Sequence, residues 1–131
     1  MNLIRLIIAG SRDFNDYELL EKEVDSFILK VQEKLDYGIP VEIVSGGARG
    51  ADRLGELYAK NKKLPVTYFI PDWDTGRGAG YIRNEEMAKY SSDCVVFILN
   101  SSKGSTHMAN TAKKYNLRLK VINLWVLVGV I

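Results

Sequence analysis

The chain has 131 residues, of which 47% are hydrophobic and 26% are charged, with a formal net charge of +2 at pH 7. This length and composition are typical of one globular domain and disfavour an intrinsically disordered chain. The small net charge argues against a protein that binds nucleic acid through a strongly basic face.

The single cysteine, Cys94, cannot form an intrachain disulfide, which fits a reducing compartment. It lies within an apolar run, so we expect it to be a buried hydrophobic side chain. No apolar run approaches the roughly 20 residues that are needed to cross a bilayer. We therefore expect a cytoplasmic protein that does not bind a membrane.

The first half of the chain alternates apolar runs with an amphipathic helix. Residues 3–9 are almost continuously apolar, which is typical of a strand buried on both faces. Apolar residues at spacings of three and four over 20–35 predict a helix, with Asn15 as its N-cap and Glu18 as its capping-box partner. A second strand is expected over 41–44.

The second half continues the same alternation. In chain order, we expect a helix from about 50 to 62, a strand over 66–70, a loop over 71–80, a helix over 82–90, a strand over 93–99, a polar turn over 100–105, a helix whose inner face carries Met108, Ala112 and Tyr115, and a strand over 119–122.

Strands that alternate with helices predict a parallel sheet with right-handed crossovers. We therefore expect an α/β, Rossmann-like fold of three layers, with a mainly parallel sheet of five or more strands and helices on both faces. This domain covers residues 1–124. The apolar tail 125–131 is expected to be an extra strand or an oligomer interface, because leaving it exposed would favour aggregation. This apolar tail favours a homo-oligomer over a monomer in which the tail packs as an edge strand.

Polar segments follow the predicted strands. In open parallel sheets, ligands bind beyond the carboxyl ends of the strands. The segments that follow strands should therefore gather at one edge of the sheet; they are residues 10–12, 45–52, 71–74 and 101–106.

The sharpest signal is the Gly-rich turn Ser45-Gly46-Gly47-Ala48-Arg49-Gly50-Ala51-Asp52. Glycines in a turn permit positive φ and let a ligand approach the backbone. The following helix has unpaired amides and a positive dipole end, and Arg49 can add a bidentate phosphate contact. The turn is neither a Walker A motif nor a dinucleotide fingerprint. The alternative is a tight strand-to-helix turn without a ligand.

Two further segments carry polar groups at helix starts. Lys103, Gly104, Ser105 and Thr106 resemble a second anion-binding turn, although ordinary N-capping by Ser105 or Thr106 is an equal alternative. Arg83 and Asn84 are expected in the first turn of a helix, where an arginine opposes the helix dipole and so hints at function. A surface Arg83 paired with Glu86 or Asp74 is the alternative.

Aromatic and titratable side chains are also placed near these turns. Phe14, Trp73 or Tyr81 could stack on a base, or plug the structure. Asp52 could bond a ribose hydroxyl or simply favour the helix dipole. His107, the one histidine, could contact a ligand, although a capping or surface role is favoured.

No group of histidine, cysteine and carboxylate residues has the spacing of metal ligands, so we predict neither a metal nor a cofactor. The candidate ligand-binding residues are Gly10, Ser11, Arg12, Ser45, Gly46, Gly47, Arg49, Gly50, Asp52, Trp73, Arg83, Asn84, Lys103, Gly104, Ser105 and Thr106.

The order of these motifs resembles a known family. The motifs are residues 9–14 (AGSRDF), 44–52 (VSGGARGAD), 72–73 (DW), 79–87 (AGYIRNEEM) and 102–106 (SKGST). Together they resemble the YspA-like branch of the SLOG superfamily, over nearly the whole chain to about Leu124. SLOG is the Rossmann-like group that also contains the DprA DNA-processing proteins and the LOG cytokinin-activating phosphoribohydrolases.

The resemblance implies a nucleotide site between the two Gly-containing turns. Gly46, Gly47 and Gly50 would line one side of it, and Gly104, Ser105 and Thr106 the other. Arg83 takes the place of an arginine of the LOG enzymes. Met108 stands where those enzymes carry their catalytic glutamate, which argues against the hydrolase activity.

Three functions remain open. The first is binding of a nucleotide or nucleotide-derived small molecule by a non-catalytic sensor or sequestering protein. The second is a phosphoribohydrolase-like N-glycosidase acting on nucleotides or ADP-ribose-like substrates, for which Arg83 and Asp52 are weak catalytic candidates. The third is a DprA-like contact with single-stranded DNA, which the modest charge disfavours.

Overall fold

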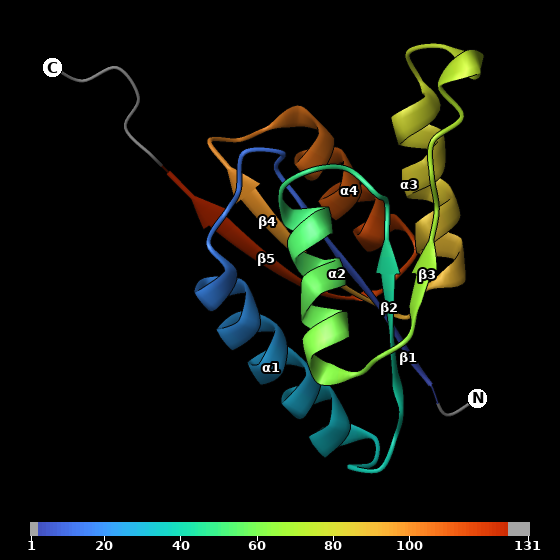
Figure 1. Cartoon of the computed structure of the whole chain (residues 1–131). Coiled ribbons are helices and arrows are strands. Elements are labelled where there is room, and N and C mark those ends of the chain that lie inside the picture. The colour runs from blue at the N-terminus through green and yellow to red at the C-terminus, as the bar shows by residue number, and fades with distance from the viewer. Residues whose placement is uncertain (1–2, 126–131) are drawn as a thin grey trace, which may run out of the picture.

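Five parallel strands form one sheet in the order β3-β2-β1-β4-β5, which confirms the expected α/β class. The structure, a computed structural model, describes residues 3–125 (Figure 1). The elements are β1 (Ile4–Gly10), α1 (Tyr17–Lys34), β2 (Val41–Ser45), α2 (Ala51–Lys62), β3 (Val66–Tyr68), the 3-10 helix η1 (Trp73–Thr75), α3 (Ala79–Tyr90), β4 (Asp93–Leu99), α4 (Lys103–Lys114) and β5 (Arg118–Leu124).

Helices cover both faces of the sheet, so the three expected layers are present (Figure 1). Side chains of β1 alternate between them: Leu6 and Ile8 pack with α1 and α2, whereas Ile7 and Ala9 pack with α3 and α4. Because both faces are covered, β1 and β4 read in the sequence as continuous apolar runs. Cys94 is fully buried in β4, as expected.

Several helix starts differ from the predictions. Asp16, not Asn15, caps α1, and its side chain accepts a hydrogen bond from the Leu19 amide at 3.1 Å. Helix α3 begins at Ala79 rather than at residue 82. Arg83 therefore lies in the second turn, and the predicted conflict with the helix dipole is wrong.

Helix α4 also begins earlier than predicted, at Lys103, with Ser102 in the N-cap position. Ser105 and Thr106, the expected caps, lie inside the helix, where the Thr106 hydroxyl donates to the Ser102 carbonyl at 2.8 Å. The predicted polar turn therefore ends before residue 103.

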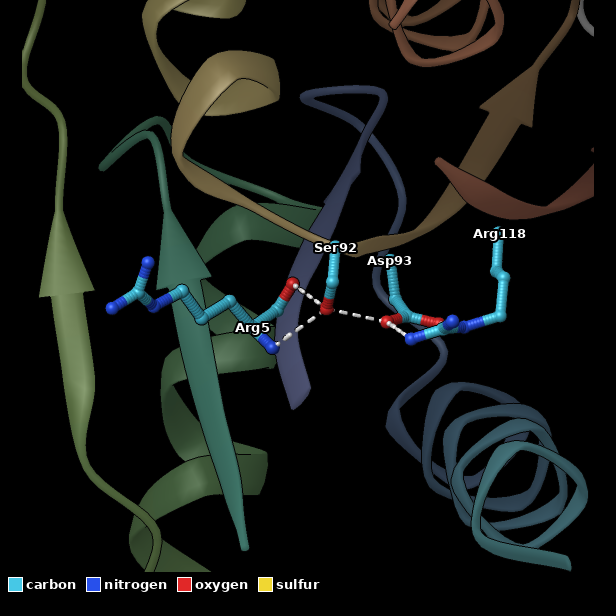
Figure 2. A network of polar contacts seen from close by, with 4 residues as sticks. All are labelled: Arg5, Ser92, Asp93 and Arg118. Atoms are coloured by element: carbon cyan, nitrogen blue, oxygen red, sulfur yellow. Dashed lines mark hydrogen bonds and ion pairs between the residues drawn. The ribbon is translucent and has the colours of Figure 1, made fainter. Parts of the chain in front are cut away.

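A polar network joins three strands at the amino edge of the sheet (Figure 2). Asp93 begins β4 and pairs in register with Arg118, which begins β5. Arg118 donates to both oxygens of the fully buried Asp93 carboxylate, at 2.7 and 2.8 Å. Ser92 also donates to Asp93 and accepts a hydrogen bond from the backbone amide of Arg5 in β1 at 3.0 Å.

Trp125 is 72% exposed, and residues 126–131 lie outside the described part of the chain. The expected roles of the tail, as an extra strand or an oligomer interface, therefore remain predictions. In residues 3–125, no helix is long and apolar enough to cross a membrane.

Candidate functional site

A cavity of about 540 Å³ opens at the carboxyl edge of the sheet. The central strand β1 lies between β2 and β4, and the chain leaves β1 and β4 toward opposite faces of the sheet. This is the topological switch point at which open parallel sheets bind ligands. The expected gathering of the strand-following segments is confirmed: residues from all four contribute to the walls.

Many of the predicted site residues line this cavity. From the loops after β1 and β2 they are Gly10, Ser11, Arg12, Arg49 and Asp52. From the segments before and within α3 and α4 they are Trp73, Arg83, Asn84, Gly104 and Ser105.

The other predicted residues do not line the cavity; they are Ser45, Gly46, Gly47, Gly50, Lys103 and Thr106. Ser45 is buried, where its hydroxyl donates to Glu56 at 2.6 Å and accepts from the Gly47 amide at 3.1 Å. These contacts shape the turn after β2. A ligand contact by these residues remains a prediction.

The N-terminus of α2 is closed by the chain itself. Gly50 has φ +79°, and a Cβ there would overlap the carbonyl oxygen of Ser11. The Ala51 amide donates to that same oxygen at 3.3 Å. The carboxylate of Asp52 in the first turn accepts from the Ala48 amide at 3.2 Å. An anion at this helix start would therefore meet a carbonyl and a carboxylate, which disfavour it.

The N-terminus of α4 is open instead. No side chain caps it, and a Cβ on Gly104 would meet nothing within 4 Å. Its first turn holds no acidic residue. The hydroxyl of Ser11 lies 2.6 Å from that of Ser102 and 3.1 Å from that of Ser105, and all three residues line the cavity. Helix amides and hydroxyls that converge in this way suit an anion.

Four arginines and two aspartates line the cavity. Arg49 pairs with Asp13 at 3.3 Å on the exposed rim. Arg12 and Arg77 are exposed and have no ion pair within residues 3–125. Their guanidinium groups remain available for bidentate contacts with phosphate. The cavity wall is therefore positively charged.

Arg83 connects α3 to the Gly-rich turn. Its guanidinium donates to the carbonyl of Gly46, and burial lowers the pKa of the side chain. A Cβ on Gly46 would overlap this guanidinium and lie 2.9 Å from Oδ2 of Asp52. Gly46 therefore lets the Arg83 and Asp52 side chains converge on one point.

Asp52 is only 4% exposed and forms no ion pair within the described residues, although it lines the cavity. Burial raises the pKa of its carboxyl group to about 6, against the opposing effects of the Ala48 amide and the Arg83 charge. Asp52 is thus a buried carboxyl group that titrates close to neutral pH.

Of the three predicted stacking residues, Phe14 is buried. Its ring stacks on Phe97 at 4.8 Å, so a role in base stacking is wrong for this residue. Trp73, in η1, is 58% exposed at the cavity. Tyr81 lies in α3 rather than in a loop, and it stacks on His107 at 4.0 Å.

His107 is held between α3 and α4 and does not line the cavity. Its Nδ1 atom lies 3.1 Å from the amide nitrogen of Asn84, and burial lowers the pKa of the ring. His107 lies inside α4 and is only partly exposed, so neither the predicted capping role nor the predicted surface role describes it; its ring packs against Tyr81 and Asn84 of α3.

Some of the residues that line the cavity were not among the predicted site residues. Arg77 lies in the loop between η1 and α3, and only its proximity to Trp73 in the sequence could have indicated it. Met87, Leu99 and Met108 form an apolar part of the wall. Met108 is buried, so the position where the resemblance places a catalytic glutamate carries a thioether. Within residues 3–125, no group of three or more His, Cys, Asp or Glu residues could hold a metal ion.

Comparisons with known proteins agree with this architecture. The Gene 61 protein of Mycobacterium phage D29 is 32% identical over 121 residues, which cover 84% of this chain and 89% of that protein. No solved structure matches the chain. The profile of the YspA, cpYpsA-related SLOG family matches residues 4–76, from β1 to just past η1. The chain therefore belongs to the YspA, cpYpsA-related SLOG family.

Proposed function

We propose that the cavity binds a phosphorylated, nucleotide-like small molecule, and that the protein acts as a sensor or sequestering protein for it. The observation that carries this proposal is the open N-terminus of α4. Three hydroxyls and the first helix amides converge there, in a cavity that also contains Arg12 and Arg77, which form no ion pair with any residue that the structure describes.

The charges favour a phosphate at α4 over one at α2. The α2 terminus already contacts the Ser11 carbonyl and carries the Asp52 carboxylate, whereas the α4 terminus has no acidic residue in its first turn. Amides at a helix N-terminus donate hydrogen bonds toward an anion, and the helix dipole adds to the attraction. Arg12 and Arg77 supply the positive charge that balances a phosphate.

The remaining walls suit an organic group attached to the phosphate. A cavity of about 540 Å³ is within the range that small ligands occupy, roughly 300–1,000 Å³. The apolar wall formed by Met87, Leu99 and Met108, together with the exposed ring of Trp73, can contact a flat base. Membership of the SLOG family supports a nucleotide-related ligand.

Gly104 offers a variant that separates binding from folding. Because a Cβ there meets open space, Gly104→Asp places a carboxylate at the helix start without a clash, and this charge repels a phosphate. Gly104→Asn has a side chain of the same size without the charge, and so serves as the control.

The test is a thermal-shift panel of inorganic phosphate, ribose 5-phosphate and nucleoside mono- and diphosphates. We expect at least one organic phosphate to raise the Tm of the wild type and of Gly104→Asn by several degrees, and to leave Gly104→Asp unchanged. Absence of any shift in the wild type, or the same shift in all three proteins, would contradict the proposal.

A second candidate is hydrolysis of the N-glycosidic bond of the bound nucleotide. The specific observation in its favour is Asp52, a cavity-lining carboxyl group whose pKa lies near 6. Chromatography of nucleoside monophosphates incubated with the protein tests it. Release of free base by the wild type but not by Asp52→Asn supports hydrolysis. Intact nucleotide after prolonged incubation contradicts hydrolysis, and binding is then the function that remains.

A further inference from the structure

Asp52 is the one lining residue of the cavity that is both acidic and buried. A carboxylate removed from water is costly unless charges or hydrogen-bond donors surround it. The amide of Ala48 donates to it at 3.2 Å, and the backbone amide of Gly10 also favours its charged form. These donors occupy only part of a carboxylate, which has about four acceptor positions.

The side chains around Asp52 do not fill the remaining acceptor positions of its carboxylate. Arg83 on α3 attracts the carboxylate, but donates its own hydrogen bonds to Gly46 and to the neighbouring Asn84. Glu56 on α2 opposes the Asp52 charge. Burial lowers the pKa of Arg83, and the charge of Arg12 adds a smaller effect in the same direction. Burial raises the pKa of the Cys94 thiol on β4, and the charges of Asp93 and Asp52 add to this. Because Asp52 lines the cavity, the acceptor capacity that remains is available to a ligand there.

Gly10 lies between Asp52 and the open N-terminus of α4. A Cβ on Gly10 would overlap the Phe97 carbonyl and lie 2.8 Å from the Cβ of Ala51, so glycine is needed where β1, β4 and α2 meet. Gly10 and Ser11 both line the cavity. Ser11, the next residue, contributes its hydroxyl to the α4 side and its carbonyl to the α2 side. A ligand whose phosphate is at α4 can therefore extend across the end of β1 toward Asp52.

We propose that Asp52 accepts hydrogen bonds from sugar hydroxyls of the ligand, so that the cavity selects a ribosyl phosphate over a deoxyribosyl phosphate. This inference rests on the proposed function, because it requires the phosphate to be bound at α4. Hydroxyl groups are the matching donors: they satisfy a buried carboxylate without bringing another charge into the cavity.

The experiment is an NMR titration of ¹⁵N-labelled protein with ribose 5-phosphate, 2-deoxyribose 5-phosphate and inorganic phosphate. The wild type should bind ribose 5-phosphate roughly ten- to a hundredfold more tightly than the deoxy sugar, the range expected for a hydrogen bond to a charged group. In Asp52→Asn this ratio should fall toward one. Asp36→Asn, in the exposed loop after α1 and outside the cavity, removes the same charge and should leave the ratio unchanged.

The pH dependence of that ratio separates a direct contact from a structural role. Protonation removes the negative charge of Asp52 and turns one of its acceptor oxygens into a hydroxyl donor, so the preference of the wild type for ribose 5-phosphate should decrease as the pH falls through about 6. The ratio in Asp52→Asn should not depend on pH in this range.

The outcomes distinguish a failure of the role of Asp52 from a failure of the phosphate site. Equal affinities in the wild type, or a ribose preference that persists in Asp52→Asn, would overturn the role of Asp52 while the phosphate site stands. If none of the three compounds shifts the Gly104 and Ser105 amide signals, the phosphate site and the role of Asp52 are both overturned.

Discussion

Asp52 and Asp93 are buried at opposite edges of the same sheet, and they differ in their partners. Asp93, at the amino end of β4, is fully buried, and both its oxygens accept hydrogen bonds from Arg118 (Figure 2). Asp52, at the carboxyl edge, is 4% exposed and has no ion pair within residues 3–125. Both carboxylates are removed from water, but within the described residues only Asp93 forms an ion pair, whereas Asp52 has the Arg83 charge nearby without an ion pair.

This difference separates a residue that serves the fold from one that we assign to a ligand. Asp93 joins β4 to β5 and, through Ser92, to β1, so its charge is satisfied within the protein. Asp52 lines a cavity with acceptor capacity to spare. A buried carboxylate that forms no ion pair lowers stability, and such residues gather at functional sites.

The largest expected loss of stability follows removal of Arg118, the cation that pairs with Asp93. Arg118→Ala leaves the buried Asp93 carboxylate with the Ser92 hydroxyl alone, so the free energy of unfolding should fall by about 3 kcal/mol. Urea denaturation followed by circular dichroism measures this change.

Arg49→Ala is the matched control, because it breaks an ion pair whose two side chains are 73% and 81% exposed. Its loss should stay below about 0.5 kcal/mol. If Arg118→Ala costs no more than Arg49→Ala, the Asp93 network does not stabilise the fold in the way described.

Removing the charge of Asp52, which forms no ion pair within the described residues, should stabilise the protein instead. Asp52→Asn keeps an oxygen acceptor for the Ala48 amide and removes the buried charge. At pH 7, without ligand, we expect this variant to be more stable than the wild type, by at most about 3 kcal/mol.

The pH dependence of the free energy of unfolding tests independently whether the Asp52 charge stabilises or destabilises the fold. The pKa of Asp52 is about 6 in the folded protein, above the ordinary value of 3.8. The stability that a protonated Asp52 confers is therefore fully present below pH 3.8 and is lost as the pH rises through about 6. The advantage of Asp52→Asn should grow over this window in urea titrations. A variant that is less stable than the wild type at pH 7 would show that Asp52 supports the fold.

The smallest expected effect comes from adding a carboxylate at the other side of the cavity. Gly104→Asp replaces a helical glycine and places a negative charge at the positive end of α4. It should raise the free energy of unfolding by about 0.5–1 kcal/mol. Gly104→Asn should gain less, because it lacks the charge. A destabilised Gly104→Asp would mean that the start of α4 is not the open space described.

Periodic patterns predicted the sheet well, because local sequence carries the signal of burial. Residues 3–9 were expected to form the first strand, and β1 spans Ile4–Gly10. The parallel arrangement then placed Ser11, Asp52 and Ser105 at one edge before any contact was known. Burial on both faces is the physical reason for this success.

Contacts between distant segments could not be predicted in the same way. The Ser11 carbonyl reaches the Ala51 amide across forty positions of the sequence, and this contact closes the helix start that seemed the best phosphate site. Phe14 lies among polar residues in the loop after β1, yet its ring stacks on Phe97. The pairing of Asp93 with Arg118 likewise depends on the register of β4 and β5.

The most direct test of the central claim is mass spectrometry of the small molecules released when purified protein is denatured. The wild type and Gly104→Asn should release the same phosphorylated compound, and Gly104→Asp, equally folded, should release none. Release of that compound in equal amounts by all three proteins would contradict a phosphate site at the N-terminus of α4, as would its absence from all three.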